Sequence, residues 1–124
     1  MNRRSGGSGI CKFQEGKFED ATQFFERAVA EAPGVAVNYL FLGICNAQLD
    51  RRDAARAALH RALDIDPVGA ARAHVHLANL WIKERQLQSA IAELEAYLAA
   101  LPTSPDADSQ RRLITQLRES MTAK

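Results

Sequence analysis

The chain has 124 residues, 47% hydrophobic and 25% charged, which is long enough to bury one core and ordinary for a soluble domain. Its net charge of +1 excludes a strong overall field for nucleic acid or an acidic membrane, and its two cysteines exclude a disulfide framework. Aromatic residues make up only 6%, whereas alanine, the best helix former, is abundant. We therefore expect packed helices.

The N-terminal residues 1–8 are basic and rich in glycine, and we expect a flexible or truncated segment there. The long apolar stretch of a secretory signal does not follow its arginines. The longest apolar run, Val35 to Cys45, is interrupted by Asn38 and falls short of the roughly 18 apolar residues of a membrane span. These observations predict a cytoplasmic protein without a membrane partner.

Small residues, prolines and apolar residues recur in phase along the chain. The pairs 34 residues apart are Gly9 and Gly43, Cys11 and Cys45, Ala21 and Ala55, Ala28 and Ala62, and Pro33 and Pro67. The pairs 35 residues apart are Ala55 and Ala90, Ala62 and Tyr97, and Pro67 and Pro102. This phase predicts three repeats over residues 9–102, with the boundaries 9–34, 35–68 and 69–102.

Within each repeat the apolar residues follow the spacing of a half-buried helix. In chain order the predicted helices are 9–15, 18–31, 35–49, 52–65, 69–84 and 87–100. Short polar breaks such as residues 50–53, and helix-stopping prolines such as Pro67, separate them into antiparallel hairpins. Residues 103–124 are predicted to form a loop and a capping helix, which begins at Asp108 or Ser109 and is apolar on one side.

Candidate catalytic and metal-binding residues are few. Cys11 and Cys45 fall at equivalent places in adjacent repeats, where helix axes are about 8–10 Å apart, too far for a disulfide. We expect them to be buried packing residues. His74 and His76 diverge by about 200° around one helix and cannot share a metal. No nucleophile, P-loop or dinucleotide-binding motif occurs, so we expect no catalysis, no metal and no cofactor.

Nucleic-acid binding is not expected either. The arginines around Arg51, Arg61 and Arg111 are interspersed with aspartates. Mixed signs make no continuous basic stripe, and no ladder of aromatic residues accompanies them.

The repeated residues resemble the tetratricopeptide repeat family. The first repeat resembles only the second half of a tetratricopeptide repeat, with the run Gly16–Ala21 followed by Phe25, Ala28 and Pro33. The second matches with Tyr39, Leu42, Gly43, Asn46, Ala55, Leu59, Ala62 and Pro67, and the third with Leu77, Ala78, Trp81, Ala90, Leu94, Tyr97 and Pro102. The resemblance implies an all-α fold, a right-handed superhelical stack of antiparallel helical hairpins (an α-solenoid).

Two departures from the family pattern stand out. Arg52 occupies the position at which Phe18 and Leu87 supply an apolar residue, so that corner of the second repeat is expected to be looser. Arg3 to Ser8 lie where the first helix should contain apolar helix formers, so that helix is incomplete.

The resemblance further implies a non-catalytic module that binds a partner peptide or helix along its concave side, which the first helix of each hairpin lines. The implied groove residues are Ile10, Phe13, Gln14, Val37, Leu40, Phe41, Ile44, Gln48, Arg72, Val75, Asn79, Ile82 and Lys83. Packing between repeats explains Phe13 and Phe41 equally well. An apolar floor with Arg72 and Lys83 predicts an amphipathic helix or extended peptide with apolar anchors and an acidic flank.

Some members of the family grip the acidic tails of chaperones with lysines and asparagines. Leu40, Phe41 and Ile44 stand where such a clamp would need polar groups, so this ligand is disfavoured. The alternative to a binding module is a self-assembling structural or scaffold element. The incomplete first helix would leave Phe24, Phe25 and Val29 under-covered, and a second chain or a parent domain would complete this N-terminal edge, giving a homo-oligomer in the first case.

Overall fold

The computed structural model describes residues 15–122. Within this range the regular elements are helices only, as predicted for an all-α fold. They are α2 (Phe18–Glu31), α3 (Ala36–Gln48), α4 (Arg52–Ile65), α5 (Ala73–Lys83), α6 (Leu87–Ala100) and α7 (Ala107–Thr122). The segment 1–8 and the predicted helix 9–15, apart from Glu15 in a turn, lie outside the described residues. No helix in the described part of the chain is long and apolar enough to cross a bilayer.

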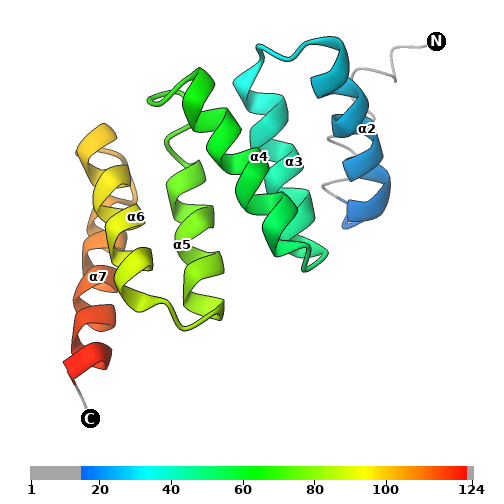
Figure 1. Cartoon of the computed structure of the whole chain (residues 1–124). Helices are drawn as coiled ribbons and strands as arrows, with labels where there is room; N and C mark the ends of the chain where they lie inside the picture. The colour runs from blue at the N-terminus through cyan, green and yellow to red at the C-terminus, as the bar shows by residue number, and fades with distance from the viewer. Residues whose placement is uncertain (1–14, 123–124) are drawn as a thin grey trace. The chain divides into compact units, whose positions relative to one another are not determined.

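The chain divides into two compact units, which meet in sequence at Asp66 and Pro67. In the first unit α3 packs against both α2 and α4 (Figure 1). In the second unit α6 packs against both α5 and α7 (Figure 1). Helices α3 and α4 form one antiparallel hairpin, and α5 and α6 form another, as the polar breaks in the sequence predict.

The core of the first unit is aromatic on the α2 side. Its buried residues are Ala21, Phe25, Leu42, Cys45 and Ala58, and Phe18, Phe24, Val29 and Phe41 pack against them while remaining partly exposed. The rings of Phe25 and Phe41 stack with centroids 5.3 Å apart and an interplanar angle of 13°. Phe41 therefore contributes to packing between α2 and α3. Of the predicted N-terminal edge, Phe25 is only 2% exposed, whereas Phe24 and Val29 are half-buried.

Helices α3 and α4 approach closely at Gly43. A Cβ at this position would lie 2.6 Å from Cγ of Leu59, 2.7 Å from its Cδ2 and 3.2 Å from the carbonyl oxygen of Ala55. Leu59 itself is fully buried. The small residue that the repeat pattern places here is thus a steric requirement of this helix crossing.

The core of the second unit lies between α6 and its two neighbours. It contains Ala78, Ala90, Ile91, Leu94, Ile114 and Leu117. Ile114 and Leu117 come from one side of α7, and residues such as Arg112, Gln116 and Glu119 on its other side are exposed. The predicted capping helix is confirmed. It begins at Ala107, ahead of both residues that the sequence offered as its cap, Asp108 and Ser109.

The predicted start of α5 is wrong: the helix begins at Ala73 and not at residue 69. Residues 67–72 form turns instead. The amide of Ala73 donates to the carbonyl of Ala70 (2.8 Å) and that of His74 to Ala71 (2.9 Å), both three residues back instead of four. Pro67 cannot donate and Gly69 is a poor helix former, so the α-helical ladder starts only after them. Arg72 therefore precedes the helix.

A residue with left-handed backbone conformation lies two positions before each of α2, α4 and α6. Gly16, Asp50 and Arg85 have φ angles of 80°, 63° and 63°. After α3 and α5 the next residue's amide reaches back to the helix: Arg51 N donates to Asn46 O, and Gln86 N to Trp81 O, each at 2.8 Å. These bonds are those of the Schellman motif, in which glycine is the usual left-handed residue.

We predict that Arg85→Gly stabilises the protein by up to about 1 kcal/mol, because glycine adopts a positive φ without the steric cost that an L side chain incurs. Urea unfolding followed by circular dichroism measures the effect. Arg85→Ala is the control, since it removes the same side chain but keeps the Cβ, and it should not stabilise. Equal shifts for both variants would assign the gain to loss of the arginine side chain instead.

Candidate functional site

The five predicted groove residues of α3 lie together on one face. The buried residues Leu42, Gly43, Cys45 and Asn46 mark the opposite side of this helix. At about 100° per residue, the outward arc is roughly 100° wide and centred near Ile44. Its members, hereafter the α3 stripe, are Val37, Leu40, Phe41, Ile44 and Gln48. Val37 is 49% exposed and Gln48 is exposed, whereas Leu40, Phe41 and Ile44 are partly buried.

Helix α3 has no charged residue in its 13 positions. The flanking helices differ, because α2 and α4 each carry five Asp, Glu, Lys or Arg residues in 14 positions. Helix faces that remain in water normally carry such charges. The α3 stripe is therefore an aliphatic and aromatic surface ending in a single amide.

The predicted residues of α5 also share a face. Val75, Asn79, Ile82 and Lys83 lie opposite the buried Ala73, Leu77, Ala78 and Leu80, and these four are hereafter the α5 stripe. Asn79 and Lys83 are exposed, and Val75 and Ile82 are partly buried. Ile82 also packs against the core of the second unit. The α5 stripe is more polar than the α3 stripe.

Arg72 directly precedes α5, and its side chain, which is 55% exposed, makes contacts within its own unit. Its Nη1 lies 3.5 Å from Oδ2 of Asp106, and its guanidinium carbon lies 5.9 Å from the centre of the Tyr97 ring. Asp106 in turn accepts hydrogen bonds from the hydroxyls of Tyr97 and Ser104, each at 2.7 Å, and from Gln110 at 3.3 Å. The pKa of Asp106 is lowered to about 2, mainly by the hydrogen bond from Tyr97 and next by the hydrogen bond from Ser104.

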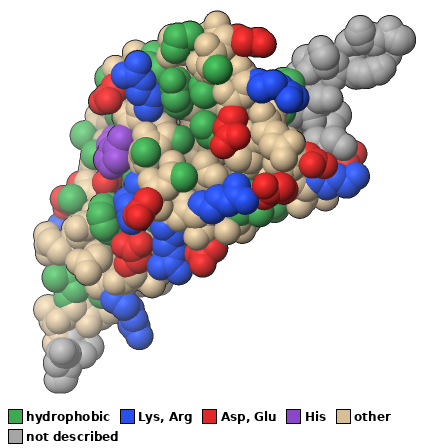
Figure 2. All heavy atoms as spheres, turned by 45° about the vertical axis from the view of Figure 1, so that its right-hand side comes forward, with side chains coloured by type: hydrophobic (Ala, Val, Ile, Leu, Met, Phe, Trp, Pro, Cys, Tyr) green, Lys and Arg blue, Asp and Glu red, His purple; other side chains and the backbone are tan. Residues whose placement is uncertain are grey.

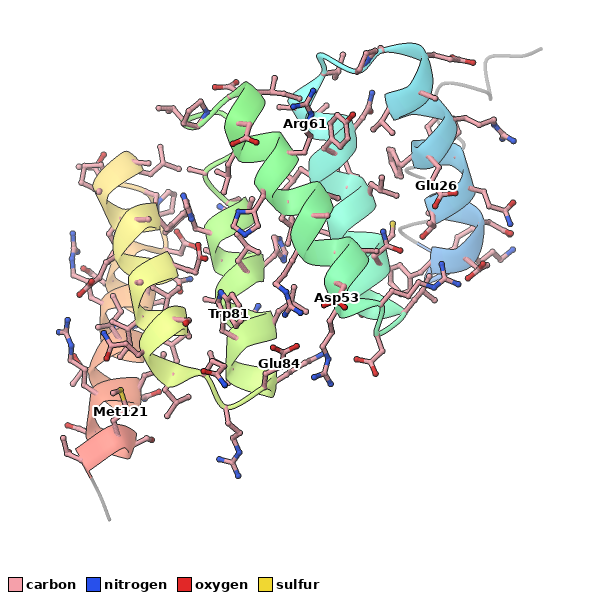
Figure 3. The ribbon with its side chains drawn as sticks, in the orientation of Figure 1. Glu26, Asp53, Arg61, Trp81, Glu84 and Met121 are labelled. Atoms are coloured by element: carbon pink, nitrogen blue, oxygen red, sulfur yellow. The ribbon has the colours of Figure 1, made fainter. Side chains whose placement is uncertain are left out.

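A polar cluster that the sequence did not indicate joins α5 to α6. Nδ1 of His74 lies 2.8 Å from Oε1 of Glu93, and Nε1 of Trp81 donates to Oε2 of the same carboxylate at 3.3 Å. His74 and Trp81 are two helical turns apart on α5, so one α6 carboxylate bridges both. Trp81 is labelled in Figure 3. His76 lies apart, and burial followed by the charge of Arg72 lowers its pKa. The described residues contain no group of three or more His, Cys, Asp or Glu side chains arranged to hold a metal.

Cys45 is a packing residue, as predicted. It is fully buried, and this burial raises the pKa of its thiol to about 11, with a hydrogen bond to Thr22 acting in the opposite direction. A thiol with so high a pKa is a poor nucleophile at neutral pH. Cys11, Ile10, Phe13 and Gln14 lie outside the described residues.

The charged residues outside these stripes are largely paired. Arg51 lies 2.6 Å from Glu19 and Arg56 2.6 Å from Asp53. Basic and acidic side chains are correspondingly interspersed on the face in Figure 2. Arg61 on α4 has its guanidinium carbon 5.9 Å from the centre of the Tyr39 ring (Figure 3).

A known family matches the first half of the chain. A family model described as tetratricopeptide repeat matches residues 12–74. The chain belongs to the tetratricopeptide repeat family. It is 36% identical over 62 residues to Protein CTR9 homolog of Arabidopsis thaliana and 25% identical over 121 residues to Sperm-associated antigen 1 of Mus musculus. These matches include 49% and 98% of this chain, but only 6% and 13% of the length of those relatives.

Solved tetratricopeptide structures share the fold. The Yersinia enterocolitica type III secretion translocator chaperone SycD superposes with a TM-score of 0.88 at 17% identity, covering 95% of this chain and 83% of that one. The TPR2B domain of yeast Sti1, solved as a complex with pHsp70, gives 0.84 at 20% identity, covering 94% and 95%. PcrH, in complex with the chaperone binding region of PopD, gives 0.81 at 21% identity, covering 97% and 90%. The helical-repeat solenoid expected from the sequence is thus confirmed.

Proposed function

We propose that this tetratricopeptide domain is a non-catalytic protein-interaction module that binds a partner polypeptide on the α3 stripe. The supporting observation is that α3 presents Val37, Leu40 and Ile44 outward without a single charged residue in the helix. Apolar residues gathered on one exposed face commonly mark a contact site. Similar solved structures support the class of function, because the Sti1 domain and PcrH were solved in complex with polypeptide partners.

The α5 stripe would supply a second contact surface of different chemistry. Asn79 and Lys83 offer one amide and one cation, beside the partly buried Val75 and Ile82. A partner segment on this face would carry hydrogen-bonding or acidic groups. Arg72 would act indirectly, because its contacts with Asp106 and Tyr97 hold the turn before α5.

The test is binding by stripe variants. We expect Leu40→Glu and Ile44→Lys each to weaken partner capture at least about tenfold, because a charge would be buried on an uncharged surface. Both side chains are partly exposed, so the melting temperature should change little. Affinity capture from a lysate of the source organism, quantified by mass spectrometry, compares each variant with the wild type.

Ala57→Lys is the matched control, because Ala57 is exposed on α4 in the same unit and the change adds the same charge. It should retain every partner that the wild type retains. If Ile44→Lys unfolds the protein, Ile44 is a core residue and the stripe is misassigned. If folded Ile44→Lys captures the same polypeptides as the wild type, the α3 stripe is not the binding surface.

A further inference from the structure

We propose that the partner segment docks on the α3 stripe as an α-helix with aliphatic residues at heptad spacing, and not as an extended peptide. This inference rests on the proposed function and specifies its ligand. The first observation is the order of side chains along α3. Val37, Leu40, Ile44 and Ala47 are separated by three, four and three residues, which is the a–d–a–d spacing of a coiled-coil seam. Phe41 and Gln48 lie beside that seam.

The residue types fit the same interpretation. The two a-like positions are β-branched, Val37 and Ile44, and the d-like positions are Leu40 and the small Ala47. β-Branched residues at a with leucine at d favour the pairing of two helices. Ala47 is half-buried at the edge of the outward arc, so a second helix could approach most closely there.

Hydrogen bonding discriminates between the two docking modes. An extended peptide exposes its N–H and C=O groups, and each one buried without a partner costs about 1–3 kcal/mol. The α3 stripe offers one polar side chain, the Gln48 amide at its end, because Val37, Leu40, Phe41 and Ile44 have none. A helix satisfies its own backbone groups internally and can bury an apolar face against this surface.

The dimensions and charge set the properties of the ligand. Val37 and Gln48 are separated by about 16 Å along the helix axis, or about three turns. A docked helix would therefore present apolar residues at i, i+3 or i+4, and i+7. Its contact face would be uncharged, because α3 has no counter-charge for a buried ion. Charged residues would be confined to its outer face.

The experiment is a selection of random peptides of about 16 residues displayed on phage, with the full chain as bait. Ile44→Lys is the counter-selection bait, and Ala57→Lys is the matched positive bait. Peptides that bind the wild type and Ala57→Lys but not Ile44→Lys report on the α3 stripe. We expect their apolar residues to recur at i, i+3 or i+4, and i+7.

Each selected peptide is then tested with one proline at a central non-contact position and with alanine there instead. Proline should weaken binding by at least about tenfold and alanine should not, because proline breaks a helix at about 3 kcal/mol. Apolar alternation at i and i+2, or binding that tolerates the proline, would overturn helical docking while leaving the α3 stripe as the site. If no peptide distinguishes Ile44→Lys from the other two baits, the proposed function of the stripe fails and the helical ligand fails with it.

Discussion

Replacing Gly43 with valine is expected to lower the free energy of unfolding by about 2–3 kcal/mol, through overpacking of the α3–α4 crossing. The added Cβ would lie 2.6 Å from a Leu59 side chain that is fully buried and cannot move into solvent. Gly43→Ala should destabilise the protein less than Gly43→Val. Its Cβ makes the same close contact with Leu59, but the higher helix propensity of alanine over glycine, about 1 kcal/mol, offsets part of that cost. Urea unfolding monitored by circular dichroism measures all of these variants.

A double-mutant cycle with Leu59→Ala identifies the clash itself. Leu59→Ala alone should cost about 3 kcal/mol through the cavity it leaves. In the double variant the valine would fill part of that cavity, so the combined loss should be smaller than the sum of the two. Gly34→Val is the control, because a Cβ there meets nothing within 4 Å, and its effect should stay below about 0.5 kcal/mol. Additive losses would mean that Gly43 and Leu59 do not limit the helix approach.

Asp106→Asn is expected to destabilise the protein by about 1–2 kcal/mol at neutral pH, because it removes a negative charge. Tyr97, Ser104 and Gln110 each donate a hydrogen bond to that carboxylate. The folded-state pKa of Asp106, about 2, lies below its ordinary value of 3.8. Its ionisation therefore stabilises the fold fully above about pH 4, and this contribution is lost as the pH falls through about 2.

The measurement is urea unfolding of wild type and Asp106→Asn from about pH 6 down to about pH 2.5. The difference in unfolding free energy between the two proteins should narrow progressively below about pH 4, because the Asp106 carboxylate of the wild type becomes protonated. The effects of the other carboxylates occur in both proteins and cancel. Asp108→Asn is the control, since Asp108 is exposed and its pair with Arg111 is a surface ion pair of less than about 1 kcal/mol. A gap that stays constant down to about pH 2.5 would show that Asp106 acts through something other than its charge.

Helix positions followed from the sequence where local signals were complete. The sequence predicts the second helix of each repeat at 18–31, 52–65 and 87–100, and α2, α4 and α6 have those bounds. Each begins after a left-handed turn and ends before a proline, both of which are local features. The start of α5 was missed because the spacing of apolar residues continues through residues 69–72, although the backbone there forms turns.

For the candidate surfaces too, the sequence predicts features within one helix but not contacts between helices. The sequence predicts that the residues of the α3 stripe share one face, because their spacing follows the period of the helix; the choice of that face comes from the resemblance to the family. The roles of Arg72, His74 and Glu93 were not predictable, because they depend on contacts between helices. Asp106 lies 34 residues from Arg72, and Glu93 lies 19 from His74. No pattern within one helix indicates which side chain of another will meet it.

The uncharged character of α3 also matters before the chain has folded. A stretch from Val35 to Leu49 without any charge is the kind of segment through which unfolded chains aggregate. Charged residues lie on both sides of it, with Glu31 four residues before Val35 and Asp50, Arg51, Arg52 and Asp53 directly after Leu49. Charges that flank an apolar segment act as gatekeepers, so we expect these residues to oppose its association with other copies of the chain during synthesis.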